Sequence, residues 1–307
     1  MTERPTTAAP RPPRLHAWWV AIRPATLPAA VGPVLVGLGV AMGIGVFAIL
    51  PALGCLAVAL LLQIASNVGN DLADFRSGVD THERLGPPRA AALGLLSERE
   101  MLAGLVVIVG LAGLVGLYLA WVGGLIIVIL GLAAIAGAFL YTSGPWPYGY
   151  HGLGEVFVFI FFGLVAVAGT TYLQTLSWEP LAFAAAVPVG ALITAVLVVN
   201  NLRDLDTDRA SGKRTLAVML GARGARLEYD VLLALAYLVP LALTVAGAGS
   251  VALLLPLLSL PMAVPLATIV HAGGDPRRLN AVLKRTARTS LVFSLLLALG
   301  LAVEGLA

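Results

Sequence analysis

The sequence predicts an all-α protein that crosses a membrane many times, and three observations lead to this fold class. Of its 307 residues, 59% are hydrophobic and only 11% are charged, whereas a soluble domain carries roughly a quarter charged residues. The apolar residues gather into long runs, and about 20 such residues are enough to span a bilayer as a helix. The basic residues are confined to a few segments between these runs. We therefore expect a polytopic membrane protein.

Nine apolar runs are long enough to be expected as transmembrane helices. They lie near 24–47, 50–70, 101–119, 122–141, 154–174, 180–200, 231–248, 250–270 and 289–306. Residues 1–23 are expected to form a cytoplasmic tail that ends in an interfacial segment, because the paired Trp18 and Trp19 favour the headgroup region. Ser97 is expected to cap the third helix, with acidic residues in its first turn. Residues 24–307 are expected to form one domain.

The distribution of basic residues predicts the orientation in the membrane. All 19 lysine and arginine residues fall in the N-terminal tail or in the connections that follow the second, sixth and eighth helices. With nine helices these four segments share one side, which the positive-inside rule makes cytoplasmic, and the C-terminus then lies outside. The pI near 9.2 therefore reflects orientation, and we expect no nucleic-acid partner. Cys55 is the only cysteine, which excludes an intramolecular disulfide.

Two acidic clusters follow directly on apolar runs. The first contains Asn67, Asn70, Asp71 and Asp74, whose spacing of three and four places them on one face at a helix end. Asp80 follows in the next loop. Carboxylates gathered at membrane helix ends are costly and indicate function. Hard divalent cations such as Mg²⁺ take carboxylate oxygens and often keep substrate phosphates as further ligands.

The second cluster lies four predicted spans later and therefore on the same side of the membrane. Asn201, Asp204 and Asp208 share a helical face, whereas Asp206 points elsewhere. The basic residues nearby are Arg203, Arg209, Lys213 and Arg214. Acids for a metal beside bases for phosphate are what a metal–diphosphate site requires. For each basic residue alone, the alternative is a solvated loop with surface ion pairs.

The connection 141–152 contains no lysine or arginine but is rich in aromatic residues. Tyr141 and Tyr148 lie in it among glycine and proline residues, and phenylalanine residues follow at the start of the next run. Aromatic ring faces can stabilise a carbocation by about 0.5–2 kcal/mol each, and an aromatic wall can hold an isoprenoid chain. The alternative for any single ring is bulk that faces lipid.

These residues resemble the UbiA superfamily of intramembrane prenyltransferases over nearly the whole chain beyond residue 15. The resemblance lies in the two acidic motifs, made of Asn67, Asn70, Asp71 and Asp74, then Asp204 and Asp208. The blocks 78–87, 141–150 and 200–216 resemble the branch that prenylates 1,4-dihydroxy-2-naphthoate in menaquinone synthesis. The spacing from Asp74 to Asp80 counts against the hydroxybenzoate, haem O and chlorophyll branches. The related eukaryotic menaquinone-forming enzyme shares parts of these blocks.

The resemblance implies a UbiA-type helical bundle in the bacterial plasma membrane. The implied reaction joins polyprenyl diphosphate to 1,4-dihydroxy-2-naphthoate with loss of diphosphate and CO2, and gives demethylmenaquinone. The implied Mg²⁺ ligands are Asp71, Asp74, Asp204 and Asp208. Catalytic roles are expected for Asp80, Tyr141, Arg203 and Lys213. Substrate contacts are expected from Asn67, Asn70, Arg84, Arg89, Tyr148, Asn200, Asn201 and Arg209.

Two alternatives remain at the level of the sequence. One is another branch of the superfamily with a different aromatic acceptor. The other is a transporter or channel, which would be expected to place its acids near the middle of a span, whereas here they lie at the cytoplasmic ends.

Overall fold

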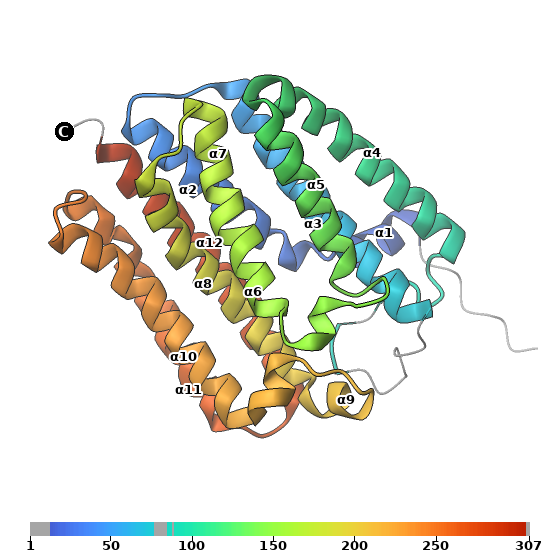
Figure 1. Cartoon of the computed structure of the whole chain (residues 1–307). Coiled ribbons are helices and arrows are strands. Elements are labelled where there is room, and N and C mark those ends of the chain that lie inside the picture. Colours follow the sequence, from blue (N-terminus) through green and yellow to red (C-terminus); the bar gives the residue numbers. More distant parts are fainter. Residues whose placement is uncertain (1–12, 77–84, 88, 305–307) are drawn as a thin grey trace, which may run out of the picture.

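The computed structural model describes residues 13–76, 85–87 and 89–304, and in this part of the chain all regular structure is helical (Figure 1). The α-helices are α1 (Arg14–Ile22), α2 (Pro28–Gly43), α3 (Ile49–Arg76), α4 (Glu98–Gly123), α5 (Leu125–Leu140), α6 (Gly154–Val158), α7 (Ala166–Thr175), α8 (Pro180–Arg203), α9 (Leu205–Ala210), α10 (Leu216–Val245), α11 (Leu260–Ala272) and α12 (Leu279–Val303). The 3₁₀-helices are η1 (Pro24–Thr26), η2 (Tyr148–His151), η4 (Val251–Ser259) and η5 (Pro276–Arg278), and η3 (Phe159–Val165) is a π-helix. The predicted all-α class is confirmed.

Seven helical segments of the described chain are long and apolar enough to cross a membrane, so the protein is a multi-pass membrane protein. An eighth candidate is the pair Arg14–Thr26 and Pro28–Gly43, which is bent by 50° at the break between them. Helix α5 has only 16 residues and a length of about 24 Å, less than the roughly 30 Å of a bilayer core. A helix lies at each of the nine predicted runs, but nine complete spans remain a prediction.

Helix α4 begins where the sequence places it. The Ser97 hydroxyl accepts a hydrogen bond from the Glu100 backbone N–H at 3.3 Å, and the Glu100 carboxylate accepts one from the Ser97 N–H at 2.8 Å. This capping box satisfies two N–H groups that a helix start leaves without partners. It fixes the end of the connection that follows the first acidic cluster.

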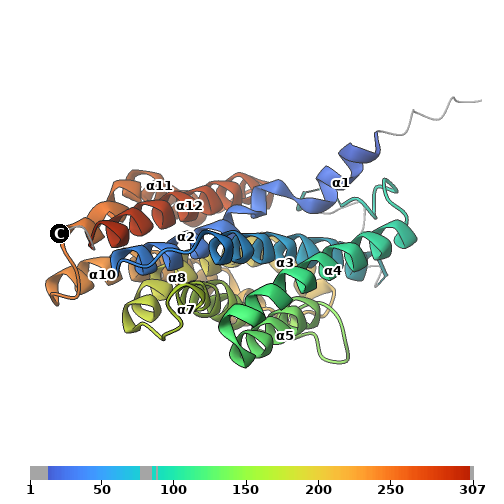
Figure 2. The ribbon, with the colours of Figure 1, turned by 90° about the horizontal axis from the view of Figure 1, so that it is seen from above.

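Helix α8 lies at the centre of the bundle and is the most buried of the seven spans. It packs against α2, α10, α12 and the π-helix η3. Figure 2 shows α2 and α8 between α12 on one side and α7 on the other. The close approach to η3 requires glycine, because a Cβ atom on Gly163 would lie 2.9 Å from the Gly190 Cα atom. The second acidic cluster therefore follows the most buried of the seven described spans.

The functional motifs gather at one end of the bundle. Helix α9 and the loop that contains η2 lie there, and the C-terminal end of α12 lies at the opposite end (Figure 1). Helix α1 lies toward the same end as α9 and packs on α3. This arrangement brings residues from α3, from η2 and from the α8–α9 junction into one region.

Candidate active site

A cavity of about 1290 Å³ runs through the bundle from the acidic clusters into its apolar interior. Its polar lining comprises Thr26, Gln63, Asn67, Asn70, Asp74, Arg89, Tyr141, Tyr150, Asn200, Asn201, Asp204, Asp208 and Lys213, among others. Its apolar lining includes Val34, Cys55, Leu119, Ile127 and Leu173, which pack together as one cluster. Cys55 and Asp74 both line the cavity and lie on α3, which places them about 28 Å apart along the helix axis.

Helix α3 presents the first motif to this cavity, with Asn67, Asn70 and Asp74 in its wall. Asp71 does not line the cavity. Each residue turns an α-helix by about 100°, so Asp71 is rotated away from its neighbour Asn70 and lies fully buried behind that face. Its Oδ2 atom accepts a hydrogen bond from the Ala90 N–H at 2.9 Å. The structure thus separates Asp71 from the three residues with which the sequence grouped it.

Asp74 is buried and has partners from two other parts of the chain. Arg89 forms an ion pair with it and also donates to the Asn70 backbone carbonyl at 3.1 Å. The Tyr150 hydroxyl donates to the Asp74 Oδ1 atom at 3.1 Å. Of the other predicted residues in this region, Asp80 and Arg84 lie outside the described residues.

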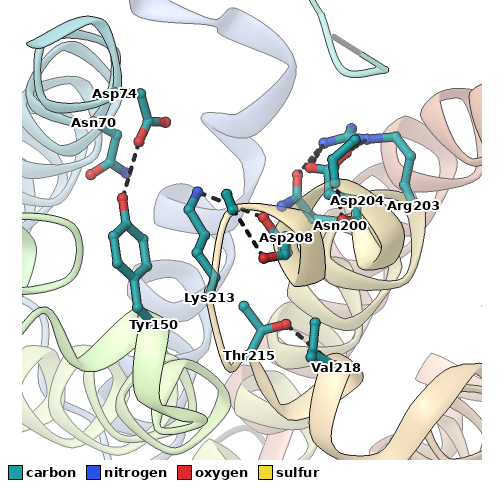
Figure 3. Close-up of polar contacts among 12 residues, drawn as sticks. Asn70, Asp74, Tyr150, Asn200, Arg203, Asp204, Asp208, Lys213, Thr215 and Val218 are labelled. Atoms are coloured by element: carbon teal, nitrogen blue, oxygen red, sulfur yellow. Dashed lines mark hydrogen bonds and ion pairs between the residues drawn. The ribbon is translucent and has the colours of Figure 1, made fainter. Parts of the chain in front are cut away.

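The second motif lies at the junction of α8 and α9. Asp204 ends α8, where it accepts hydrogen bonds from Arg203 at 2.8 Å to Nε and 2.5 Å to Nη2. Asp208 lies one turn later and forms an ion pair with Lys213 at 3.6 Å. Burial raises the pKa of Asp208 to about 6, and the nearby Lys213 ammonium partly opposes this shift. Figure 3 shows these carboxylates on one stretch of chain that faces Tyr150 and Asp74.

Arg203 is buried and does not line the cavity, but it donates hydrogen bonds to residues that do. Besides Asp204, it donates to the Asn200 side-chain oxygen at 2.9 Å and to the Asn280 side-chain oxygen at 2.9 Å. The Asn280 amide in turn donates to the Leu85 carbonyl at 2.8 Å. Asn280 thereby joins the second motif to the connection between α3 and α4. The sequence offered no signal for Asn280, because a single asparagine in a basic loop forms no pattern.

Arg209 lies on the surface and is absent from the cavity wall. Its exposed guanidinium pairs with the exposed carboxylate of Asp206 at 3.4 Å. The structure therefore assigns Arg209 to a solvated ion pair, the alternative that the sequence left open, whereas Lys213 lines the cavity.

The aromatic loop forms part of the cavity wall. Tyr141 and Tyr148 meet edge to face with ring centroids 5.5 Å apart, and Tyr148 stacks on Phe157 at 4.2 Å. The Tyr148 hydroxyl donates to the Gly137 carbonyl at 2.6 Å, which fixes its ring. The carbonyl oxygen of Tyr141 lies where a Cβ atom on Gly149 would be only 2.7 Å away. Gly149 is therefore needed for the loop to pack this closely against Tyr141.

Arg23, Thr142 and Tyr150 are among the lining residues that the sequence did not single out as site residues. Arg23 lies in a left-handed backbone conformation with φ of 54°. The Thr142 hydroxyl donates to the Asn70 side-chain oxygen at 2.7 Å. Tyr150 contacts Asp74, as described above. Tyr150 and Thr142 belong to the aromatic loop, so the loop as a whole was the signal that could have identified them.

The donor set suits a hard divalent cation, although the described residues contain no group of three or more His, Cys, Asp or Glu side chains that could by itself hold a metal ion. Asp74, Asp204 and Asp208 all line the cavity. The first two are near enough to raise the pKa of Asp208 electrostatically. Carboxylates that share one cavity fit Mg²⁺, which usually keeps water and substrate phosphate in its remaining positions.

Comparisons with known proteins show the family to which the chain belongs. Residues 30–302 match the UbiA prenyltransferase family. Proteins named 1,4-dihydroxy-2-naphthoate octaprenyltransferase are similar over most of their length. The one from Haemophilus influenzae is 39% identical over 94% of this chain and 97% of its own. The one from Mycobacterium tuberculosis is 42% identical over 93% and 97%.

A solved structure shows the same fold at much lower identity. The UbiA homolog from Archaeoglobus fulgidus bound to GPP and Mg²⁺ aligns with a TM-score of 0.67 and 17% identity, and the match covers 94% of this chain and 99% of that one. The family match covers well over half of the chain, and the relatives exceed 30% identity. The chain therefore belongs to the UbiA prenyltransferase family.

Proposed function

We propose that the protein transfers a polyprenyl group from polyprenyl diphosphate to 1,4-dihydroxy-2-naphthoate, with release of diphosphate and CO2, to give demethylmenaquinone. The observation that carries this proposal is the single cavity in which acids and bases lie at one end and apolar side chains continue far into the bundle. A prenyl diphosphate has the same division into a charged head and a long apolar tail. Relatives of about 40% identity carry the name of this activity.

Mg²⁺ is the proposed cofactor, with Asp74, Asp204 and Asp208 as its ligands among the described residues. When bound there, the cation neutralises charge on the departing diphosphate. The fourth predicted ligand, Asp71, accepts a hydrogen bond from the Ala90 N–H and does not line the cavity, so its part in metal binding stays a prediction that Asp71→Ala tests. Asp80 keeps its predicted role in orienting or deprotonating the naphthol, and Arg84 keeps its predicted contact with substrate.

The basic residues of the cavity bind the diphosphate in this proposal. Lys213 and Arg89 line the cavity beside the carboxylates and can donate charge-assisted hydrogen bonds to phosphate oxygens. Arg203 holds Asp204 and Asn200 in place. Asn67, Asn70 and Asn201 complete the polar wall, and the Asn201 amide donates to buried Glu155 at 2.7 Å.

The aromatic wall stabilises the allylic cation and keeps water from it. The rings of Tyr141, Tyr148 and Phe157 line the cavity, and their faces attract a cation through the ring quadrupole. An apolar wall around the reacting carbon also limits the access of water to a reactive intermediate. The hydroxyl of Tyr148 is already bonded to the backbone, so its ring is the group that acts.

The proposed location is the bacterial plasma membrane, with the N-terminus and the site loops in the cytoplasm and the C-terminus outside. Support comes from the basic residues, which gather in the segments that adjoin the site. The naphthoate, as a charged molecule, would then enter from the cytoplasmic side.

Product analysis with the purified protein in lipid tests this function. The reaction contains Mg²⁺, a long prenyl diphosphate and either dihydroxynaphthoate or hydroxybenzoate. We expect prenylated naphthol and CO2 only with the first acceptor, and a loss on the order of 10²–10³-fold in kcat for Asp74→Ala and for Asp204→Ala. Product from hydroxybenzoate alone would move the protein to another branch, and no product from either would favour a transporter.

A further inference from the structure

Tyr150 contacts the first acidic motif and the basic segment that follows the second, although it belongs to neither motif. It lies in η2, and its hydroxyl donates to the Asp74 carboxylate at 3.1 Å. The Lys213 ammonium lies 4.6 Å from the centroid of the same ring, within the range of a cation–π contact. Figure 3 shows the Tyr150 side chain directed toward Asp74, with the Lys213 side chain beside it.

The loop around Tyr150 is also joined by a backbone hydrogen bond to the basic segment that follows the second motif. The Arg214 N–H donates to the Tyr150 carbonyl at 2.9 Å, one residue beyond Lys213. Lys213 in turn pairs with Asp208. Contacts therefore run from Asp74 through Tyr150 and Lys213 to Asp208, and all four side chains line the cavity.

We propose that Tyr150 is a positioning residue that holds the two motifs at the separation required for the Mg²⁺–diphosphate complex. This inference rests on the proposed function and adds a residue to it. The hydroxyl fixes Asp74 from α3, while the ring face orients the Lys213 ammonium from the segment after α9. The two halves of the side chain therefore serve two different ligands, the metal and the phosphate.

Two substitutions separate these contributions. Tyr150→Phe removes the hydrogen bond to Asp74 and keeps the ring, whereas Tyr150→Leu removes both contacts. The measurement is calorimetric binding of an unreactive geranylgeranyl thiolodiphosphate at graded Mg²⁺ concentrations, alongside kcat and KM for prenyl transfer. We expect Tyr150→Phe to raise the half-saturating Mg²⁺ concentration roughly tenfold and to leave affinity for the probe at saturating Mg²⁺ nearly unchanged.

Tyr150→Leu is expected to raise the Mg²⁺ requirement similarly and also to weaken probe binding at saturating Mg²⁺ by roughly threefold or more. The matched control is Tyr172→Phe, which removes a hydroxyl that donates to the Gly123 carbonyl at 3.2 Å, away from the cavity. It should bind Mg²⁺ and probe as the wild type does.

The outcomes are distinguishable. Wild-type affinities in both Tyr150 variants would overturn the inference while leaving the proposed function intact. A wild-type protein that binds no probe at any Mg²⁺ concentration would overturn the proposed function and, with it, this role for Tyr150. If Tyr150→Leu fails to fold, as judged by thermal unfolding, Tyr150→Phe decides alone through its Mg²⁺ requirement.

Discussion

At the scale of single residues, each described carboxylate of the cavity has a basic partner. Asp74 pairs with Arg89, Asp204 with Arg203 and Asp208 with Lys213. Burying a charge without a partner is expensive, and removing one member of a buried pair leaves such a charge behind. Substitution of the basic member should therefore disturb the acid as well, and loss of activity in such a variant would not by itself identify a phosphate contact.

Asp71 and Asp74 provide a direct comparison. In Asp71→Ala the buried Ala90 N–H loses its acceptor, which should lower the free energy of unfolding by about 1–3 kcal/mol. The half-saturating Mg²⁺ concentration should stay within about twofold of wild type, since Asp71 does not line the cavity. Thermal unfolding in detergent and Mg²⁺ titration of prenyl transfer measure the two effects.

Asp74→Ala is the matched variant, and its half-saturating Mg²⁺ concentration should rise far above that of the wild type. A raised Mg²⁺ requirement in Asp71→Ala with unchanged stability would place Asp71 in the ligand set.

The sequence could predict much of the candidate site but not its partners. Helical spacing placed Asn67, Asn70, Asp71 and Asp74 on one face. The first two and Asp74 line the cavity and Asp71 does not, because a spacing of three or four defines a broad face rather than a direction. The contacts of Tyr150 and Asn280 join segments that are distant in the chain. Such contacts depend on how helices pack, which a local pattern does not contain.

At the scale of elements, η3 packs closely on α8 through Gly163 and Gly190. The π-helix widens the turn within the span that carries Phe157 and Phe161, and such turns are frequent at functional sites. The hydropathy of the sequence could not predict this π-helix, because its residues are as apolar as those of the α-helical turns around it. The bend before α2 was hidden for a similar reason: the run 24–47 reads as one apolar segment, yet the chain breaks between η1 and Pro28.

Two glycine substitutions test the packing of η3 on α8. The Cβ atom of Gly163→Ala would lie 2.9 Å from the Gly190 Cα atom, so the helices must separate, and the free energy of unfolding should fall by about 1–3 kcal/mol. Gly131→Ala is the control, because its Cβ atom meets nothing within 4 Å. It should be neutral or stabilising by up to about 1 kcal/mol. Equal unfolding temperatures for the two variants would show that η3 adapts at no cost.

At the scale of the whole molecule, composition alone predicted a multi-pass helical protein, because apolar runs of span length have few other uses. The number of complete spans is less determined by the sequence. Helix α5 is short and the segment before α2 is bent, so length and hydropathy give different counts at these two places. The depth of α5 and of the segment before α2 in the bilayer depends on how the neighbouring helices pack against them.

The orientation can be measured with single cysteines in a Cys55→Ala background. Ala248→Cys lies exposed between α10 and η4, and Ala272→Cys lies exposed at the end of α11. The positive-inside rule predicts that a membrane-impermeant maleimide labels position 248 in intact cells and position 272 only after lysis. The opposite pattern would invert the proposed topology and place the site outside the cytoplasm.

The background substitution matters because of where the natural thiol lies. Cys55 is the only cysteine in the chain, and it lines the apolar part of the cavity. Any covalent adduct formed on a cysteine of the native protein is therefore located on the cavity wall, with a stoichiometry of one per chain. An electrophilic analogue that enters the apolar part of the cavity and reaches the buried Cys55 thiol would therefore mark that wall without any change to the sequence.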